Sequence, residues 1–122
     1  MTVPHCTLEY SANLTDFAAS RMLAALNAGL LASGLFAEAD IKSRAIRLEQ
    51  FAVGVVPAPR AFVHLTLSVL SGRSADERAA LARQALAVLE AGSIAPAGTE
   101  LQLSVDVAEM ERATYAKAVR HA

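Results

Sequence analysis

Arg73 is the residue whose position is best suited to binding a ligand. It lies in the run Gly72-Arg73-Ser74, directly before a predicted helix. Its guanidinium would therefore lie beside free backbone N–H groups and the positive end of the helix dipole. Such a combination suits a carboxylate, which arginine binds with two parallel hydrogen bonds. From the residues alone, the more common alternative is a solvated ion pair with Asp76 or Glu77.

Three further residues are candidates for the same chemistry. Lys42 and Arg44 alternate on one face of a predicted strand, where they are either solvent-exposed or part of an anion pocket, and the pattern favours exposure. Pro4 opens the first predicted strand. Proline at the first residue of a strand is common and requires no function.

The histidines and the cysteine favour structural roles. His5, His64 and His121 have no metal-ligand spacing, so we predict no metal site, and we expect His64 to be a hydrogen-bonded structural residue. Cys6 lies on an apolar strand face and is predicted to be a buried small hydrophobe. The sequence has no glycine-rich phosphate loop, paired-histidine helix motif or convincing nucleophile triad.

The composition describes one small domain that associates with copies of itself. The chain has 122 residues, of which 54% are hydrophobic and 19% charged, so we expect apolar surface to be covered by another copy. A net charge of -1 gives no electrostatic case for nucleic acid or an acidic membrane. One cysteine, no visible secretory signal and no apolar run of membrane-spanning length predict a cytoplasmic protein.

The first half of the chain predicts a strand, a helix and a second strand. Residues 4–10 alternate between apolar and polar, as in a half-buried strand. Asn13 and Asp16 resemble a capping box that opens a helix, which continues to about residue 32 before the stop signal Gly34. Residues 41–55 have strand character.

The second half repeats this order after a proline-rich turn. Residues 62–70 alternate strongly and predict a strand. Ser74 and Glu77 form a second capping box, opening a helix to about residue 90. Residues 101–107 alternate again, and the tail, residues 110–122, is consistent with a short helix.

The order β-α-β, β-α-β predicts an α+β fold, a single domain over residues 1–122. Right-handed crossovers place both helices on one face of a four-stranded mixed sheet. The other face would be bare and partly apolar. In so short a chain its cover must be another subunit, so association is expected.

Four segments of the chain form a pattern. They are Pro4-His5 with Glu9; Ala32-Ser33-Gly34-Leu35-Phe36 with Ile41-Lys42-Ser43-Arg44; Phe62-Val63-His64-Leu65-Thr66-Leu67; and Gly72-Arg73-Ser74. Together they resemble the 5-carboxymethyl-2-hydroxymuconate isomerases, a family of the tautomerase superfamily, and they occur in the family's order and near its spacing over about residues 4–90.

The resemblance implies a homotrimer with inward-facing sheets and no metal or organic cofactor. It implies an isomerase that moves a double bond in an unsaturated 2-hydroxy/2-oxo acid, during breakdown of homoprotocatechuate. Pro4 falls on the catalytic N-terminal proline that carries the proton. Lys42 and Arg73 fall on substrate-binding arginines, and Arg44 on a further arginine of the motif.

Two departures from the family pattern bear on activity. Lys42 replaces an arginine and loses its bidentate fork. Pro4 follows Val3, so its nitrogen is an amide and cannot act as a base; we hypothesise that the working protein starts at Pro4, with Val3 encoded by an alternative start codon. The alternatives are a promiscuous 2-oxo-acid tautomerase and a non-catalytic trimeric protein that binds carboxylates.

Overall fold

The computed structural model describes residues 3–121. Met1, Thr2 and Ala122 lie outside the described residues, and with them the predicted start of the chain and the last residue of the predicted domain and tail. Two one-turn 3-10 helices, Glu38–Asp40 and Arg112–Thr114, accompany the main elements. These are β1 (His5–Ser11), α1 (Ala19–Ala32), β2 (Lys42–Leu48), β3 (Arg60–Leu70), α2 (Ala75–Gly92) and β4 (Glu100–Met110).

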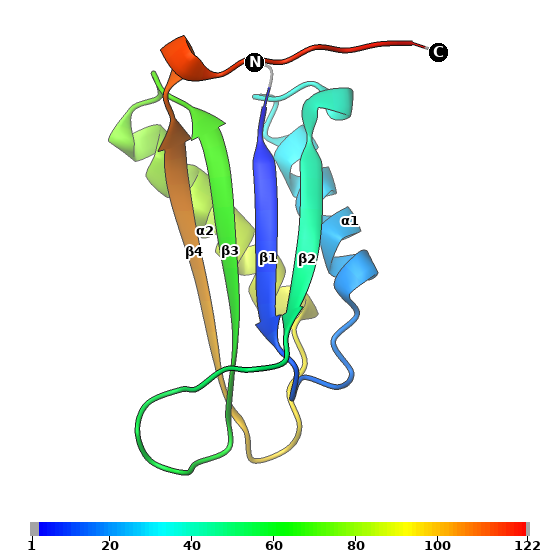
Figure 1. The fold of residues 1–122 in the computed structure, drawn as a ribbon, viewed down its shortest axis with the longest axis vertical. Helices are drawn as coiled ribbons and strands as arrows, with labels where there is room; N and C mark the ends of the chain where they lie inside the picture. Colours follow the sequence, from blue (N-terminus) through cyan, green and yellow to red (C-terminus); the bar gives the residue numbers. More distant parts are fainter. Residues whose placement is uncertain (1–2, 122) are drawn as a thin grey trace.

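The four strands form one mixed sheet in the order β2-β1-β3-β4. β1 pairs parallel with β2 and antiparallel with β3, and β3 pairs parallel with β4. Each helix crosses over between two parallel strands, and both helices cover the same face of the sheet (Figure 1). The predicted fold, two helices on one face of a four-stranded mixed sheet, is confirmed.

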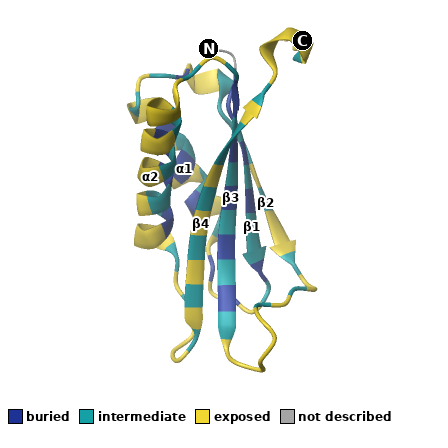
Figure 2. Ribbon diagram, turned by 90° about the vertical axis from the view of Figure 1, so that its left-hand side faces the viewer, coloured by how far each residue is buried: buried dark blue, intermediate teal, exposed yellow. Residues whose placement is uncertain are grey.

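The core lies between this covered face and the two helices. Along β3, buried residues alternate with less buried ones (Figure 2). Alternation arises because successive side chains of a strand point to opposite faces. The sheet residues that are at most 1% exposed include Cys6, Leu8, Val63, Leu65, Leu67 and Val69, and the helices contribute Met22, Leu26, Leu30, Leu81, Ala85 and Leu89.

The uncovered face is partly apolar, as the sequence predicted. Partners in the strand register share a face, so His5 and Lys42 lie on the same side as Ser68, and Thr7 lies beside Arg44. Its apolar residues include Leu48, Phe62, Met110 and the 45% exposed Ile46. Its other polar residues include Glu9, His64, Thr66, Ser104 and Asp106.

One of the two predicted capping boxes is confirmed and the other is wrong. The Ser74 hydroxyl accepts a hydrogen bond from the Glu77 N–H at 3.1 Å, and the Glu77 carboxylate accepts one from the Ser74 N–H at 3.0 Å. The first helix instead begins at Ala19 with no side-chain cap. Asn13 donates from Nδ2 to the Arg60 carbonyl at 2.8 Å, so it fastens the loop to β3.

Two other boundaries differ from the prediction. The second strand ends at Leu48, because residues 49–59 form an irregular loop with Gly54 at φ +71° and two prolines near its end. The tail forms only the single turn Arg112–Thr114 and continues without regular structure.

Candidate active site

The sheet topology brings three of the predicted site residues to one end of the molecule. β1 and β2 start together, and the Lys42 N–H donates to the Pro4 carbonyl at 3.2 Å. β3 runs in the opposite direction and ends there, with Ser68 opposite His5. The turn that carries Arg73 follows at the same end. We call this region the Pro4 end.

Pro4 is enclosed in the chain as it stands. Both Pro4 and the preceding Val3 are fully buried. The Pro4 nitrogen is an amide, whose lone pair is delocalised into the carbonyl and does not accept protons. The Val3 side chain occupies space beside that nitrogen, so removing Val3 would change both the chemistry and the accessibility of the nitrogen.

Lys42 opens β2 and belongs to a charged cluster at the start of that strand. Its ammonium donates to the Asp40 carbonyl at 2.7 Å, and the Lys117 ammonium donates to the Asp40 carboxylate, also at 2.7 Å. The hydrogen bond from Lys117 holds the pKa of Asp40 below its ordinary value, and the same bond raises the pKa of Lys117. Burial, reinforced by the charge of Lys117, lowers the pKa of Lys42.

Arg44 reaches the residue next to Pro4. Its guanidinium lies 2.9 Å from Nδ1 of His5, whose Nε2 lies 3.0 Å from the Tyr115 hydroxyl. Burial lowers the pKa of His5, and the cations Arg44, Lys42 and Lys117 lower it further. The imidazole is therefore held in its neutral form by the surrounding positive charge.

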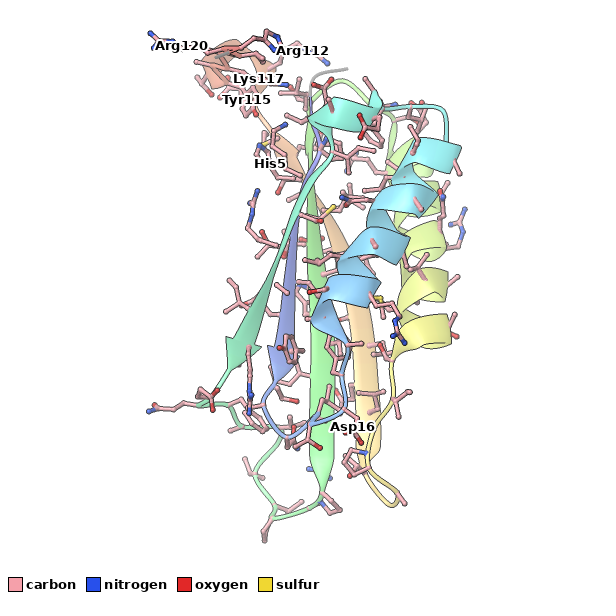
Figure 3. The ribbon with its side chains drawn as sticks, turned by 90° about the vertical axis from the view of Figure 1, so that its right-hand side faces the viewer. His5, Asp16, Arg112, Tyr115, Lys117 and Arg120 are labelled. Atoms are coloured by element: carbon pink, nitrogen blue, oxygen red, sulfur yellow. The ribbon has the colours of Figure 1, made fainter. Side chains whose placement is uncertain are left out.

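Tyr115 and Lys117 come from the C-terminal tail, which the sequence analysis did not assign to the site. The tail runs across the Pro4 end, close to the start of β1 (Figure 1). Tyr115 and Lys117 lie above His5 in the side-chain view (Figure 3). Periodicity could not reveal this placement, because Tyr115 and Lys117 lie outside regular structure and bond to residues 110 and 77 positions earlier.

Arg73 lies on the helix side of the Pro4 end. Its side chain is only 9% exposed, and its guanidinium carbon lies 5.2 Å from the centre of the Phe36 ring. One terminal nitrogen donates to the Leu35 carbonyl at 3.5 Å and the other lies 3.9 Å from the Glu77 carboxylate. The predicted pair with Glu77 exists, but the arginine is buried instead of solvated. Its Nε is buried without a hydrogen-bond partner among the described residues.

The remaining chemical candidates have structural surroundings. His64 Nδ1 lies 2.7 Å from the Ser104 hydroxyl, on the uncovered face. Burial raises the pKa of Cys6 to about 11, so its thiol stays protonated in the core. In residues 3–121, no group of three His, Cys, Asp or Glu side chains could hold a metal ion. Within the same range, no helix is long and apolar enough to cross a bilayer.

Comparisons with known proteins identify the family. The model of the 5-carboxymethyl-2-hydroxymuconate isomerase family matches residues 4–121. Among the curated proteins no sequence matches the chain. A 5-carboxymethyl-2-hydroxymuconate isomerase from Deinococcus radiodurans R1 is 34% identical, with a TM-score of 0.83 over 96% of this chain and 90% of that one.

Two more distant structures share the fold. A 5-carboxymethyl-2-hydroxymuconate delta-isomerase has 20% identity and a TM-score of 0.66, covering 98% of this chain and 89% of its own. A fused 4-OT, described as a symmetric trimer, has 16% identity and a TM-score of 0.68, covering 93% of this chain and 91% of its own. The extent of the family match and the 34% identity lead to one conclusion: the chain belongs to the 5-carboxymethyl-2-hydroxymuconate isomerase family, within the tautomerase superfamily.

Proposed function

We propose that this protein moves a double bond in an unsaturated 2-hydroxy/2-oxo di- or tricarboxylic acid, such as 5-carboxymethyl-2-hydroxymuconate, during the breakdown of aromatic compounds. The proton would travel through the nitrogen of Pro4. The observation that carries the proposal is the grouping of Lys42, Arg44, Lys117 and Arg73 around the end of the sheet where β1 begins.

The surroundings of Pro4 suit an amine that accepts and returns protons. A free amino terminus has an ordinary pKa of about 7.7–8.0. Burial and nearby cations lower the pKa of the adjacent His5, and the same influences would lower that of a Pro4 amine. An amine with a pKa near neutrality can take a proton from the substrate and return it to another atom, first as general base and then as general acid.

Arg73 and Lys42 would bind the carboxylates of the substrate. The Nε of Arg73, buried without a hydrogen-bond partner in residues 3–121, supports this role, because a carboxylate oxygen would supply the missing acceptor. Lys42 offers a point charge instead of a planar fork, so it fixes the position of a carboxylate less strictly. Arg44 would add positive charge that favours the dienolate over the neutral substrate.

We also propose that the protein works as a homotrimer in the cytoplasm. The uncovered face of the sheet supports association, since its apolar residues Ile46, Leu48 and Phe62 are covered by neither α1 nor α2. The shared fold with a structure described as a symmetric trimer supports the number three. The near-neutral net charge gives no reason to expect a nucleic-acid or membrane partner.

The decisive experiment is a paired assay of two chains, one as written and one that begins at Pro4. We expect turnover of 5-carboxymethyl-2-hydroxymuconate only by the second chain, because only there is the nitrogen an amine and the space of the Val3 side chain open. Pro4→Ala in the shortened chain replaces the secondary amine by a primary one and should lower kcat strongly. No turnover by either chain, with both folded, would contradict the proposal.

Two variations of the assay separate the alternatives. A panel of 2-oxo acids tests the promiscuous tautomerase, which would prefer aryl pyruvates to the muconate. Carboxylate binding without turnover by the shortened chain would favour a non-catalytic binding protein. The full chain gives a specific reason to consider this alternative, because its Pro4 nitrogen is an amide and cannot act as a base. Mass spectrometry of the active cellular protein shows whether its first residue is Pro4.

A further inference from the structure

We propose that Tyr115 is a further catalytic residue, whose hydroxyl donates a hydrogen bond to the dienolate oxygen formed during the reaction. The proposal rests on the function proposed above. It assigns a role to the C-terminal tail, which places one aromatic hydroxyl beside the residue that follows Pro4.

The direction of the hydrogen bonds leaves the Tyr115 proton available. Arginine has no acceptor, so Arg44 must donate to Nδ1 of His5 at 2.9 Å. The neutral imidazole then carries its proton on Nε2, which donates to the Tyr115 oxygen at 3.0 Å. The Tyr115 O–H must point elsewhere, and no other partner for it is found among the described residues. Within residues 3–121 it is a donor without an acceptor, at the edge of the Pro4 end.

Two contacts of the tail hold Tyr115 in place. On one side, the Arg112 N–H donates to the Ser71 hydroxyl at 3.0 Å, and the Arg112 side chain donates to the Ser71 carbonyl at 3.3 Å. On the other side, Lys117 pairs with Asp40 at 2.7 Å. Tyr115 lies between these anchors, and its ring packs edge-on against His5. A donor that is fixed before the reaction stabilises developing charge without a reorganisation cost.

The assigned step is balanced without an external reagent. The Pro4 amine takes a proton from the substrate, and the electron pair of the broken bond spreads into the dienolate, whose C2 oxygen gains negative charge. The ammonium form of Pro4 then returns the proton to a different atom, and the double bond moves. Tyr115 transfers no proton in this step; its hydrogen bond and the Lys117 charge stabilise the oxygen.

Tyr115→Phe in the chain beginning at Pro4 tests this role. Loss of one donor to a developing oxyanion typically lowers kcat by about 10²–10³-fold, so we expect kcat to fall by about 10²-fold with little change in KM. The matched control is Tyr10→Phe, the other tyrosine of the chain, whose ring packs on Phe17. Equal activity of Tyr115→Phe and the parent would overturn the proposal.

A binding measurement keeps this test separate from failure of the proposed function. Oxalate is a planar dianion that mimics the enolate of a 2-oxo acid, and its affinity is measured by calorimetry whether or not the chain turns over substrate. We expect Tyr115→Phe to weaken oxalate binding by about tenfold, as for loss of a hydrogen bond to a charged group. Unchanged affinity, or no oxalate binding by the parent, would contradict the role of Tyr115 even if the isomerase assay is negative.

Discussion

The two faces of the sheet are made by alternate residues of the same strands, yet they differ in chemistry. Leu67 is fully buried under the helices, whereas its neighbour Thr66 lies on the uncovered face. The covered face is apolar and accounts for the stability of the chain. The uncovered face carries His5, Arg44 and His64, whereas the buried Arg73 lies on the helix side. Adjacent positions of one strand therefore have independent surroundings.

The largest expected difference between the faces is in stability. Leu67→Ala should lower the free energy of unfolding by about 2–5 kcal/mol, because it leaves a cavity in the core. Thr66→Ala, one residue earlier, should change it by only about 0.5 kcal/mol. Urea unfolding of the two variants measures both values. Similar losses of unfolding free energy for the two substitutions would show that both faces contribute equally to stability.

The second difference is in ligand binding at the Pro4 end. Arg73→Ala in the chain beginning at Pro4 should weaken oxalate binding by about tenfold or more, the usual loss for a hydrogen-bonded charge. Arg73→Lys should recover part of the affinity, since it restores the charge but not the fork. Arg83→Ala, an exposed arginine of α2, is the control. Equal oxalate affinity in all three variants would show that Arg73 does not bind the ligand.

A smaller effect on stability is expected where the helix layer meets the Pro4 end. Ser74→Ala should lower the free energy of unfolding by about 1 kcal/mol, because the N–H of Glu77 loses its acceptor. Thermal unfolding of Ser74→Ala and Ser74→Asp provides the measurement. Aspartate also caps helices and should retain most of the stability, so equal losses in both variants would contradict the capping role.

The smallest effect concerns pH at the uncovered face. The pKa of His5 is lowered from its ordinary value of 6.5 by burial and by Arg44, Lys42 and Lys117. As the pH falls, His5 is therefore protonated in the unfolded chain before it is protonated in the folded chain. The free energy of unfolding consequently decreases as the pH falls below 6.5. Nitrogen-detected NMR should find His5 neutral, with its proton on Nε2, at pH 6.5. A half-protonated imidazole at that pH would contradict the assigned hydrogen bonds.

The sequence predicted what depends on periodicity. The alternation over residues 62–70 specified a buried face of β3, and the Ser74–Glu77 spacing specified the start of α2. Asn13 has the same local signal, but its amide bonds to the Arg60 carbonyl instead, a contact that depends on tertiary structure. A local pattern cannot distinguish a helix cap from a hydrogen bond to a distant carbonyl, because either one satisfies the hydrogen-bonding groups of the side chain.

The candidate site was predictable only where a family motif marks it. Pro4, Lys42 and Arg73 do lie at one end of the sheet, as expected if they share a pocket. Nothing in the sequence near Tyr115 or Lys117 indicated their contacts, since the tail is held by His5 and Asp40 from the opposite end of the chain. The burial of Arg73 likewise depends on Phe36, in the loop after α1.

The central claim is that in the working protein, which we propose begins at Pro4, the Pro4 nitrogen is an amine whose pKa is lowered by fixed positive charge. Titration of ¹⁵N-labelled proline in the chain beginning at Pro4 measures that pKa directly. We expect a value below about 7.7, the lower end of the ordinary range for a free amino terminus, and a rise when Lys42→Gln removes a neighbouring charge. A value above about 8.0 that does not respond to Lys42→Gln would contradict the claim.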